Sequence, residues 1–289
     1  MPRACAVRAT SLSRSFVSSS GWRKRISMLG NDVVDLQDAD ADPGSFRPRF
    51  DERVFSEAER AAIADDPYPL ARRWAHWAAK EAAYKLARQI DEHFVFSPSI
   101  LVARFEPVPD VGGQRLGRIV RHGRLDLPRT LGTSIRVLEL RSFETSEWVH
   151  AVVIPSGSDW EAVQIGFDSR GGLSMDSSGA VRSLALRGIA RSLAVQPERL
   201  ALEKRGRIPV VELDGARTSL ALSLSHHGRW VGFACAPWGT VTSGRVEAAR
   251  KPWRLETMAA AMSDADSTES KPGAIHDEKS WTGRAERTA

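Results

Sequence analysis

The sequence predicts an α+β fold made of two similar halves, each with a helix packed on an antiparallel sheet. Two observations lead to this fold class: the chain holds two long amphipathic helical stretches, and each is followed by two β-rich runs with a hairpin pattern. The halves are expected over residues 29–155 and 156–238. If the repeat reflects an internal duplication rather than chance, the halves pack as a pseudo-dimer with a ligand cleft between them.

Capping signals define the helices of the first half. The S-x-x-E capping box that begins at Ser56 predicts a short helix over residues 57–65. Asp66 is the expected cap of a longer helix, which begins with Pro67 and runs to about Arg88.

Alternating apolar residues predict one hairpin in each half. In the first half, residues 134–140 and 148–154 are β-rich runs joined by a short polar link. In the second half, an amphipathic helix over residues 179–195 precedes the runs 219–225 and 230–236. Both return strands begin with the dipeptide Trp-Val, which supports the repeat.

The two ends of the chain differ from its middle in composition. Residues 1–27 hold six Lys or Arg residues and no acid, so the formal charge of +5 becomes −1 for residues 28–289. Two explanations of this leader stay open, an organelle transit peptide and a start codon assigned ahead of a true start at Met28. Residues 239–289 lose periodicity and are expected to form a disordered tail.

The composition also bears on the class of protein. No apolar run approaches the length of a membrane span, and Cys5 and Cys235 do not form a zinc-binding pattern. We therefore expect a soluble, cytoplasmic protein without a membrane partner. Because the excess positive charge lies in the leader, a basic nucleic-acid-binding protein is the less favoured alternative.

The longer helix of the first half carries charged residues on its apolar face. At about 100° per residue, Glu81 and Lys85 fall within the same stripe as Trp74 and Trp77. A carboxylate buried there without a partner is costly, so we expect Glu81 to meet a cation, a metal or a water-filled cleft. The competing interpretation is a simple i,i+4 ion pair between Glu81 and Lys85.

A second carboxylate, Asp32, lies in a short apolar run that begins at Gly30. An aspartate close to a glycine is common in turns, which is the competing interpretation. Combined with Glu81, it offers two hard carboxylates from separate elements. Such a pair suits Mg²⁺, which fills its other positions with water and substrate phosphate, and it does not exclude Mn²⁺.

Phosphate-binding groups are expected in the second half. His226 follows the alternating run Leu-Ser-Leu-Ser, and the basic segment Lys204-Arg-Gly-Arg-Ile-Pro209 precedes it along the chain. Cations near a histidine are typical of phosphate capture. The alternative is a solvated basic loop.

Together these motifs resemble the 4′-phosphopantetheinyl transferase superfamily over about residues 29–237, and the resemblance implies the pseudo-dimer fold of that superfamily. Their order, with G-x-D first and S-x-S-H last, is similar to that of holo-acyl carrier protein synthase and opposite to that of the surfactin-type enzymes. The motifs are Gly30-x-Asp32, Arg53-Val-Phe-Ser-Glu-Ala-Glu59, Trp77-x-x-Lys-Glu-Ala-x-x-Lys85, Gly206-Arg-Ile-Pro209 and Ser223-Leu-Ser-His226.

The resemblance implies Mg²⁺-dependent transfer of the phosphopantetheine arm of coenzyme A to a serine of an apo acyl or peptidyl carrier protein, with release of 3′,5′-ADP. This is the reaction that activates carrier proteins for fatty acid biosynthesis. It implies that Asp32 and Glu81 hold the metal and that Glu81 and Lys85 are catalytic. The residues it implies for contacts with coenzyme A are Lys85, Arg205, Arg207, His226 and Arg53.

The resemblance leaves several points open. The base that takes the serine proton is either Glu81 or a water on the metal. The carrier can be of the fatty-acid, polyketide or nonribosomal-peptide type, and use of acylated coenzyme A is also open. The partner should be a small acidic helical domain. Arg72 and Arg73 either steer it by contacting its acids or form a solvated helix face. Because one chain supplies both halves, a monomer is expected.

The chain departs from the family pattern at two places. Surfactin-type enzymes carry a second acid two residues after the G-x-D aspartate, where this chain has Val34. Asp35 is one place further along a strand and should face the other way, so it is left out of the ligand set. The Gly206–Pro209 stretch is also one residue longer than the usual G-K-P. These departures leave open the alternative that the chain is a non-catalytic relative, which binds a carrier protein or coenzyme A without transfer.

Overall fold

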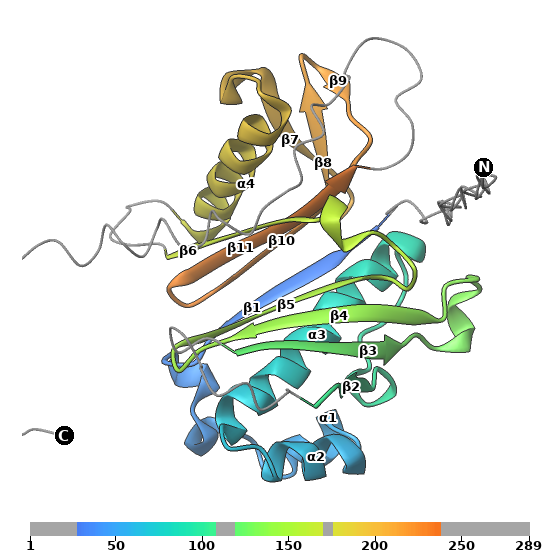
Figure 1. Cartoon of the computed structure of the whole chain (residues 1–289), viewed down its shortest axis with the longest axis vertical. Helices are drawn as coiled ribbons and strands as arrows, with labels where there is room; N and C mark the ends of the chain where they lie inside the picture. The colour runs from blue at the N-terminus through green and yellow to red at the C-terminus, as the bar shows by residue number, and fades with distance from the viewer. Residues whose placement is uncertain (1–27, 108–118, 170–175, 238–289) are drawn as a thin grey trace, which may run out of the picture. The chain divides into compact units, whose positions relative to one another are not determined.

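The computed structural model describes residues 28–107, 119–169 and 176–237 (Figure 1). All of them belong to one compact unit. The predicted leader of residues 1–27 and the predicted tail of residues 239–289 lie outside the described residues. No helix in the described ranges is both long and apolar enough to cross a membrane.

The described part of the first half holds one five-stranded sheet and three α-helices. Its strand order is β1-β5-β4-β3-β2, and neighbouring strands are antiparallel. Short 3-10 helices lie in the connections: η1 (Ala39–Ala41), η2 (Pro43–Ser45), η3 (Pro98–Ile100) and η4 (Arg129–Leu131). The main elements are β1 (Gly30–Asp35), α1 (Phe50–Val54), α2 (Glu57–Ala64), α3 (Pro69–Ile90), β2 (Ala103–Phe105), β3 (Ile119–Asp126), β4 (Val137–Glu144) and β5 (Trp148–Pro155).

The described part of the second half holds one long helix and two three-stranded antiparallel sheets, ordered β10-β11-β6 and β7-β8-β9. Figure 1 shows α4 and the small sheet together at one end of the view, with α1 and α2 at the other. The elements are η5 (Trp160–Ala162), β6 (Gln164–Ser169), α4 (Ser177–Leu193), η6 (Pro197–Arg199), β7 (Leu200–Arg205), β8 (Ile208–Leu213), β9 (Ala216–Arg217), β10 (Leu220–His227) and β11 (Trp230–Pro237).

The two halves repeat one order of elements. In the first half a strand, a helix and a hairpin give the order β1-β5-β4, and in the second half they give β6-β11-β10. The repeated tryptophans, Trp148 and Trp230, both pack on Phe167. The α+β fold class is therefore confirmed, whereas the division between residues 155 and 156 stays a prediction. Strands β2, β3 and β6 and the β7-β8-β9 sheet were not predicted from the sequence.

The predicted helices form close to their expected positions. The capping box that begins at Ser56 is present and starts α2. The prediction that Asp66 caps the long helix is wrong, because α3 has Tyr68 as its N-cap and Pro69 as its first residue. The carboxylate of Asp66 instead forms an ion pair with Arg121 of β3 at 2.8 Å. A second proline two residues after Pro67 supplies the fixed φ that begins a helix.

Two sheets pack face to face between the long helices. α3 covers the face of the first sheet that carries Val149 and Val153. The opposite face carries Val152, which packs in one apolar cluster with Ala234 of β11. The far face of the second sheet carries Phe233, which packs in the cluster that includes α4. The order of layers is α3, first sheet, second sheet, α4.

Strand β1 is buried along its whole length. Because side chains alternate along a strand, its even-numbered residues from Gly30 to Val34 point toward α3. Its odd-numbered residues from Asn31 to Asp35 point toward β10 and β11 of the second half. One strand therefore contacts both halves of the molecule.

Gly30 allows α3 to approach β1 at backbone distance. A Cβ atom at this position would lie 1.9 Å from the carbonyl oxygen of Ala82. Asp32 lies two residues after Gly30 on the same face, and Glu81 is the neighbour of Ala82 on the helix. The missing side chain of Gly30 thus sets how closely the two carboxylates approach each other.

A buried polar cluster holds α2 and the segment before β2 against α3. The ammonium group of Lys80 donates to Glu59 at 2.9 Å and to two backbone carbonyl oxygens. Glu59 also accepts from the backbone N–H of Ala103. Burial raises the pKa of Glu59, but the interactions with His76 and Lys80 outweigh it and hold the pKa at about 2.

We expect Gly30→Ala to lower the free energy of unfolding by about 2–3 kcal/mol or more, because the new methyl group forces α3 away from β1. Denaturant titration measures the change. Gly44→Ala is the matched control, since its Cβ would meet no atom closer than 3.5 Å and should cost less than about 0.5 kcal/mol. Equal stabilities of the two variants would contradict the close approach.

We expect Lys80→Met to lower the free energy of unfolding by about 3–5 kcal/mol, because it leaves the Glu59 carboxylate buried without its cation. Adding Glu59→Gln to this variant should restore at least about 1 kcal/mol, since the unpaired charge is then gone. Denaturant titration at neutral pH measures both. A double variant that is no more stable than Lys80→Met would show that the charge is not the cause.

Candidate active site

Residues from β1 and α3 meet on the helix side of the strand. Lys85 Nζ donates to Asp32 Oδ1 at 2.7 Å and to the carbonyl oxygen of Asn31 at 3.0 Å. Glu81 lies one helical turn before Lys85. The structure therefore brings together three of the residues that the sequence motifs single out, Asp32, Glu81 and Lys85.

Glu81 has the electrostatic environment of a cation ligand. Burial raises its pKa, the negative charge of Asp32 raises it further, and Lys85 lowers it in part, so that the pKa is about 7. Within the described ranges, no residue forms a hydrogen bond or ion pair with its carboxylate. Two neighbouring carboxylates that repel each other fit a divalent cation with oxygen ligands, because the cation removes the repulsion. Asp32 and Glu81 are thus a donor set that suits Mg²⁺.

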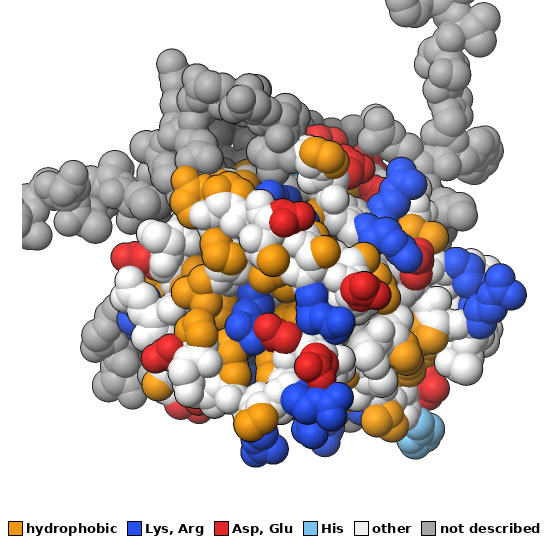
Figure 2. Space-filling model, turned by 90° about the horizontal axis from the view of Figure 1, so that it is seen from below, with side chains coloured by type: hydrophobic (Ala, Val, Ile, Leu, Met, Phe, Trp, Pro, Cys, Tyr) orange, Lys and Arg blue, Asp and Glu red, His pale blue; other side chains and the backbone are white. Residues whose placement is uncertain are grey.

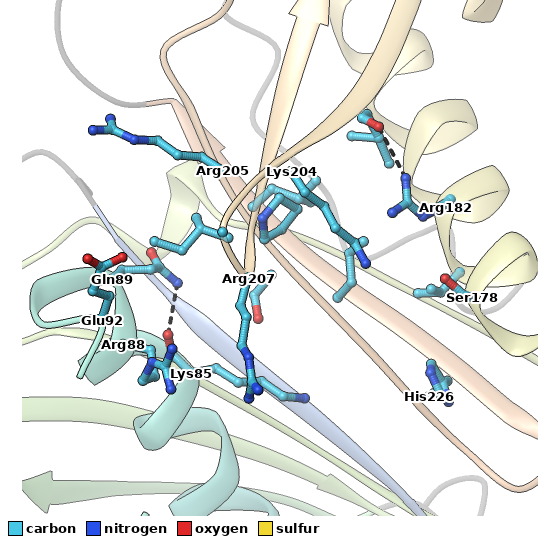
Figure 3. A pocket seen from close by; sticks show the side chains of 18 of the residues that line it. Lys85, Arg88, Gln89, Glu92, Ser178, Arg182, Lys204, Arg205, Arg207 and His226 are labelled. Atoms are coloured by element: carbon cyan, nitrogen blue, oxygen red, sulfur yellow. Dashed lines mark hydrogen bonds between the residues drawn. The ribbon is translucent and has the colours of Figure 1, made fainter. Parts of the chain in front are cut away.

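A cavity of about 350 Å³ lies beside Lys85. Residues of α3 line it from the first half, and residues of α4, β7, β8 and β10 line it from the second half (Figure 3). Among its lining residues Glu92 is the one acid, and His226 adds a titratable ring. The Lys and Arg side chains that line it are Lys85, Arg88, Arg182, Lys204, Arg205 and Arg207. A lining with this charge favours a ligand that carries several negative charges.

The turn between β7 and β8 places basic side chains at this cavity. Arg205 pairs with Ile208 across the hairpin, so Gly206 and Arg207 form a two-residue turn. Gly206 has a φ of 60°, which glycine adopts without strain. In Figure 3 Arg207 points toward Lys85, whereas Arg205 extends away from it. Arg207 of this motif thus reaches the cavity from the turn.

Strand β10 presents His226 to the cavity and its neighbour to the first half. His226 and Leu224 line the cavity. Ser225, between them, lies 2.9 Å from the side-chain nitrogen of Asn31 on β1. Because side chains alternate along a strand, Ser223 and Ser225 of the S-x-S-H motif contact Asn31 of the first half, whereas His226 points into the cavity.

The prediction that Asp35 faces away from Asp32 is confirmed. The side chain of Arg229 donates to both carboxylate oxygens of Asp35, at 2.8 and 2.9 Å. Burial raises the pKa of Asp35, but the hydrogen bonds from Arg229 outweigh it and hold the pKa at about 2. Val34, on the same face as Asp32, is buried in the apolar cluster under α3. Neither position adds a ligand to the candidate metal site.

Three arginines do not lie where the sequence predicted them, at the coenzyme A site or on the outward face of the helix. Arg53 is exposed at the end of α1 and is not among the residues that line the cavity. Arg72 and Arg73 were expected on an outward face, and this prediction is wrong. Arg72 is buried with its guanidinium 4.2 Å from the Phe105 ring centre, and Arg73 forms an ion pair with Asp51. The segments around α1 and β2 cover that face of α3.

Two cavity cations, Arg88 and Arg182, were not among the predicted site residues. Arg88 follows Lys85 by three residues, so helical periodicity places both on one face, and this signal was available in the sequence. Arg182 comes from α4, and its guanidinium donates to the carbonyl oxygen of Leu202 on β7. Its place in the cavity depends on the packing of α4, which no local pattern predicts.

A second group of possible metal ligands lies beyond the end of β1. Ligand atoms of Asp38, Asp40 and His227 lie within 4.8 Å of one another. His227 Nδ1 already accepts the backbone N–H of Asp35 at 3.0 Å, and Asp38 accepts the backbone N–H of Asp40. Since Asp40 is exposed and two of the three groups have protein partners, this group serves as a control for metal-binding experiments.

One comparison with known proteins, with protein-family models, agrees with the motif pattern. The family model of the 4′-phosphopantetheinyl transferase superfamily matches residues 28–103, which hold the Asp32 and Glu81 motifs. A crystal structure of the Thermotoga maritima holo-[acyl-carrier-protein] synthase matches 66% of this chain and 85% of that chain. Its sequence identity is 14% and its TM-score is 0.31, and so low a score adds nothing to the assignment. The search of curated proteins found no match.

The family match covers the strand and the helix that bring Asp32, Glu81 and Lys85 together. The cavity beside them has the cationic lining that a phosphate-rich ligand needs. The chain is therefore similar to the 4′-phosphopantetheinyl transferase superfamily over residues 28–103, about a quarter of its length.

Proposed function

We propose that this protein transfers the 4′-phosphopantetheine arm of coenzyme A to a serine of an apo carrier protein, as a holo-acyl carrier protein synthase does. The observation that carries the proposal is a cavity lined by six Lys and Arg side chains from both halves, one of which, Lys85, also pairs with Asp32 beside Glu81. Coenzyme A carries a pyrophosphate and a 3′-phosphate, which require cations on more than one side.

The proposed reaction is a phosphoryl-type transfer. The serine oxygen of the carrier forms a bond to the phosphorus that bears pantetheine, and the pyrophosphate P–O bond breaks. The electron pair of that bond leaves with 3′,5′-ADP, and the serine proton passes to a base. Catalysis of this kind depends on positioning and on stabilising the charge of the leaving phosphate.

The residues divide this work between the halves. In the first half, Asp32 and Glu81 would hold Mg²⁺, which when bound neutralises the pyrophosphate and orients it. Lys85 lies beside Asp32 and also lines the cavity, so its ammonium group can contact the same phosphates. In the second half, Arg207 and His226 line the cavity and are proposed to contact the phosphates of the nucleotide.

The partners follow from this proposal. The acceptor is an apo acyl or peptidyl carrier protein, and coenzyme A is the donor. Because one chain supplies the residues on both sides of the cavity, the protein can act as a monomer in the cytoplasm. The alternative is a non-catalytic relative that binds coenzyme A or a carrier protein, and Val34 in place of a third acid is the observation that favours it.

A nucleic-acid-binding function has less support. Figure 2 shows the face seen from below Figure 1, where Lys and Arg side chains are interspersed with Asp and Glu side chains. Nucleic acid binding requires a continuous basic surface, which this face does not offer. The positive excess of the sequence lies in residues 1–27.

The direct test is the intact mass of an apo acyl carrier protein after incubation with the full chain, coenzyme A and Mg²⁺. We expect a gain of one phosphopantetheine, about 340 Da, and at least a 100-fold slower gain with Glu81→Gln, because that variant loses a charged metal ligand. Asp40→Asn, in the other acidic group, is the matched control and should leave the rate unchanged. No gain with acyl and peptidyl carriers, while coenzyme A still binds, would favour the non-catalytic relative.

The raised pKa of Glu81 predicts how stability depends on pH without metal. Because its pKa in the folded chain, about 7, lies above the usual 4.5, the folded state favours the protonated form. The cost of ionising it is absent below pH 4.5, grows as the pH rises to 7 and is complete above that. In EDTA, Glu81→Gln should therefore be more stable than the natural chain at pH 8 by about 2 kcal/mol and equally stable near pH 4.

Adding Mg²⁺ at pH 8 should reverse this order, since only the natural chain gains stability from the metal. Thermal unfolding with EDTA and with Mg²⁺ measures both effects. If Glu81→Gln is destabilising in EDTA at pH 8, groups of the protein already stabilise the ionised carboxylate, and the prediction of a cation site is wrong.

A further inference from the structure

A network of buried polar groups joins β1 to the second half directly beside Asp32. Asn31 is completely buried. Its side-chain nitrogen lies 2.9 Å from Ser225 Oγ and 3.1 Å from His150 Nε2. Its backbone N–H donates to Ser223 Oγ at 3.0 Å. Asn31 thus contacts the neighbouring strand of its own sheet and β10 of the other half.

Packing alone does not explain an asparagine at this position. Burial, with a smaller effect from the charge of Lys85, lowers the pKa of His150 to about 3, so its ring is neutral and Nε2 can accept the amide hydrogen. Neither Asn31 Oδ1 nor His150 Nδ1 has a hydrogen-bond partner among the described residues. A buried amide with an unpaired oxygen is less favourable than an aliphatic side chain of similar size. A contribution to the stability of the fold therefore does not explain why position 31 is an asparagine.

The network lies between the two parts of the candidate site. Asp32 follows Asn31 on β1 and points toward Glu81 and Lys85. His226 follows Ser225 on β10 and lines the cavity. A shift of β10 along β1 would move His226 relative to Asp32 and would leave the fold of each half intact. Hydrogen bonds that are specific for one register oppose such a shift.

We propose that Asn31 is a positioning residue, which with Ser223 and Ser225 sets the distance between the metal donors of the first half and the phosphate-binding cations of the second. This inference rests on the proposed function and adds to it. It requires that the network couples the binding of Mg²⁺ to the binding of coenzyme A, and that it contributes little to the binding of Mg²⁺ alone.

Isothermal titration calorimetry on the full chain tests the coupling. In the natural chain, Mg²⁺ should strengthen coenzyme A binding by about tenfold or more. In Asn31→Val the same ratio should fall to within about twofold of unity, while the affinity for Mg²⁺ alone changes by less than about twofold, because both ligands lie in the first half. Ser225→Ala, which removes one hydrogen bond, should lower the ratio in part, by about threefold.

Thr218→Val is the matched control. It removes a hydroxyl hydrogen bond, to the carbonyl oxygen of Val211, within the second half and away from β1. Its ratio should equal that of the natural chain. The proposal is overturned if Ser225→Ala and Asn31→Val keep the natural ratio, or if Asn31→Val weakens Mg²⁺ alone by the same factor. Should Asn31→Val fail to fold, Ser225→Ala decides alone.

Failure of the proposed function gives a different result. If Mg²⁺ has no effect on coenzyme A binding in the natural chain, the shared metal and phosphate site is wrong, and the positioning role is wrong with it. If the natural chain shows the coupling and the variants keep it, only the role of Asn31 is wrong.

Discussion

The arrangement depends on one strand that is used from both sides. Strand β1 is buried at every position, because α3 packs on one of its faces and the second sheet packs on the other. A strand has only two faces, and here the two faces contact different parts of the molecule. The even-numbered residues bring Asp32 to the helix with Glu81 and Lys85. The odd-numbered residues fasten the second half, which supplies the cations of the cavity.

This arrangement places strict limits on β1. The helix approaches so closely that any side chain at position 30 would collide with its backbone. On the other face, a Cβ atom at Gly232 would lie 2.7 Å from the side chain of Val33, so only glycine fits there. Asp35 accepts two hydrogen bonds from the side chain of Arg229. The contacts at the two ends of the strand differ in kind, since Asn31 uses neutral hydrogen bonds and Asp35 uses an ion pair. Together they leave little freedom for the register between the halves.

The electrostatics of the site follow from the same geometry. Asp32 and Glu81 are close enough to repel each other, and one lysine beside them does not remove the repulsion. Six Lys and Arg side chains from α3, α4 and the β7–β8 hairpin line the cavity beside them. Each set is unfavourable without a ligand of the opposite charge. Under the proposed function, a metal bound to a polyphosphate would carry both charges at once, which is consistent with the two sets lying side by side.

Local patterns in the sequence are sufficient to predict much of this fold. The capping box at Ser56, the stripe that holds Glu81 and the two hairpins depend on neighbours in the chain, and all of them form. The family motifs add His226 and Arg207, which both line the cavity. What the sequence does not reveal depends on contacts between distant segments. Asp66 could serve either as a helix cap or as a partner for Arg121, and only the position of β3 decides between them.

The same limit applies to the faces of α3. Periodicity separates an apolar stripe from the rest, but it cannot tell whether a polar residue outside the stripe meets solvent or another element. Arg72 meets Phe105, and Lys80 meets Glu59, so both are buried although their sequence context is that of an exposed face. Asn31 is the corresponding case on β1. It has the appearance of a turn residue beside a glycine, and its role emerges only when Ser223 and Ser225 are placed opposite it.

The repeat also shows how the halves have taken different roles. Trp148 and Trp230 occupy matching places at the start of the return strands, and the residues four places before them are Glu144 and His226. Glu144 is completely buried and forms an ion pair with Arg121, whereas His226 is exposed and lines the cavity. In the first half this position thus holds an internal ion pair, whereas in the second half the corresponding residue lines the cavity. Because the proposed metal donors, Asp32 and Glu81, come from β1 and α3 of the first half alone, the proposed site is a single one, to which the second half adds basic side chains.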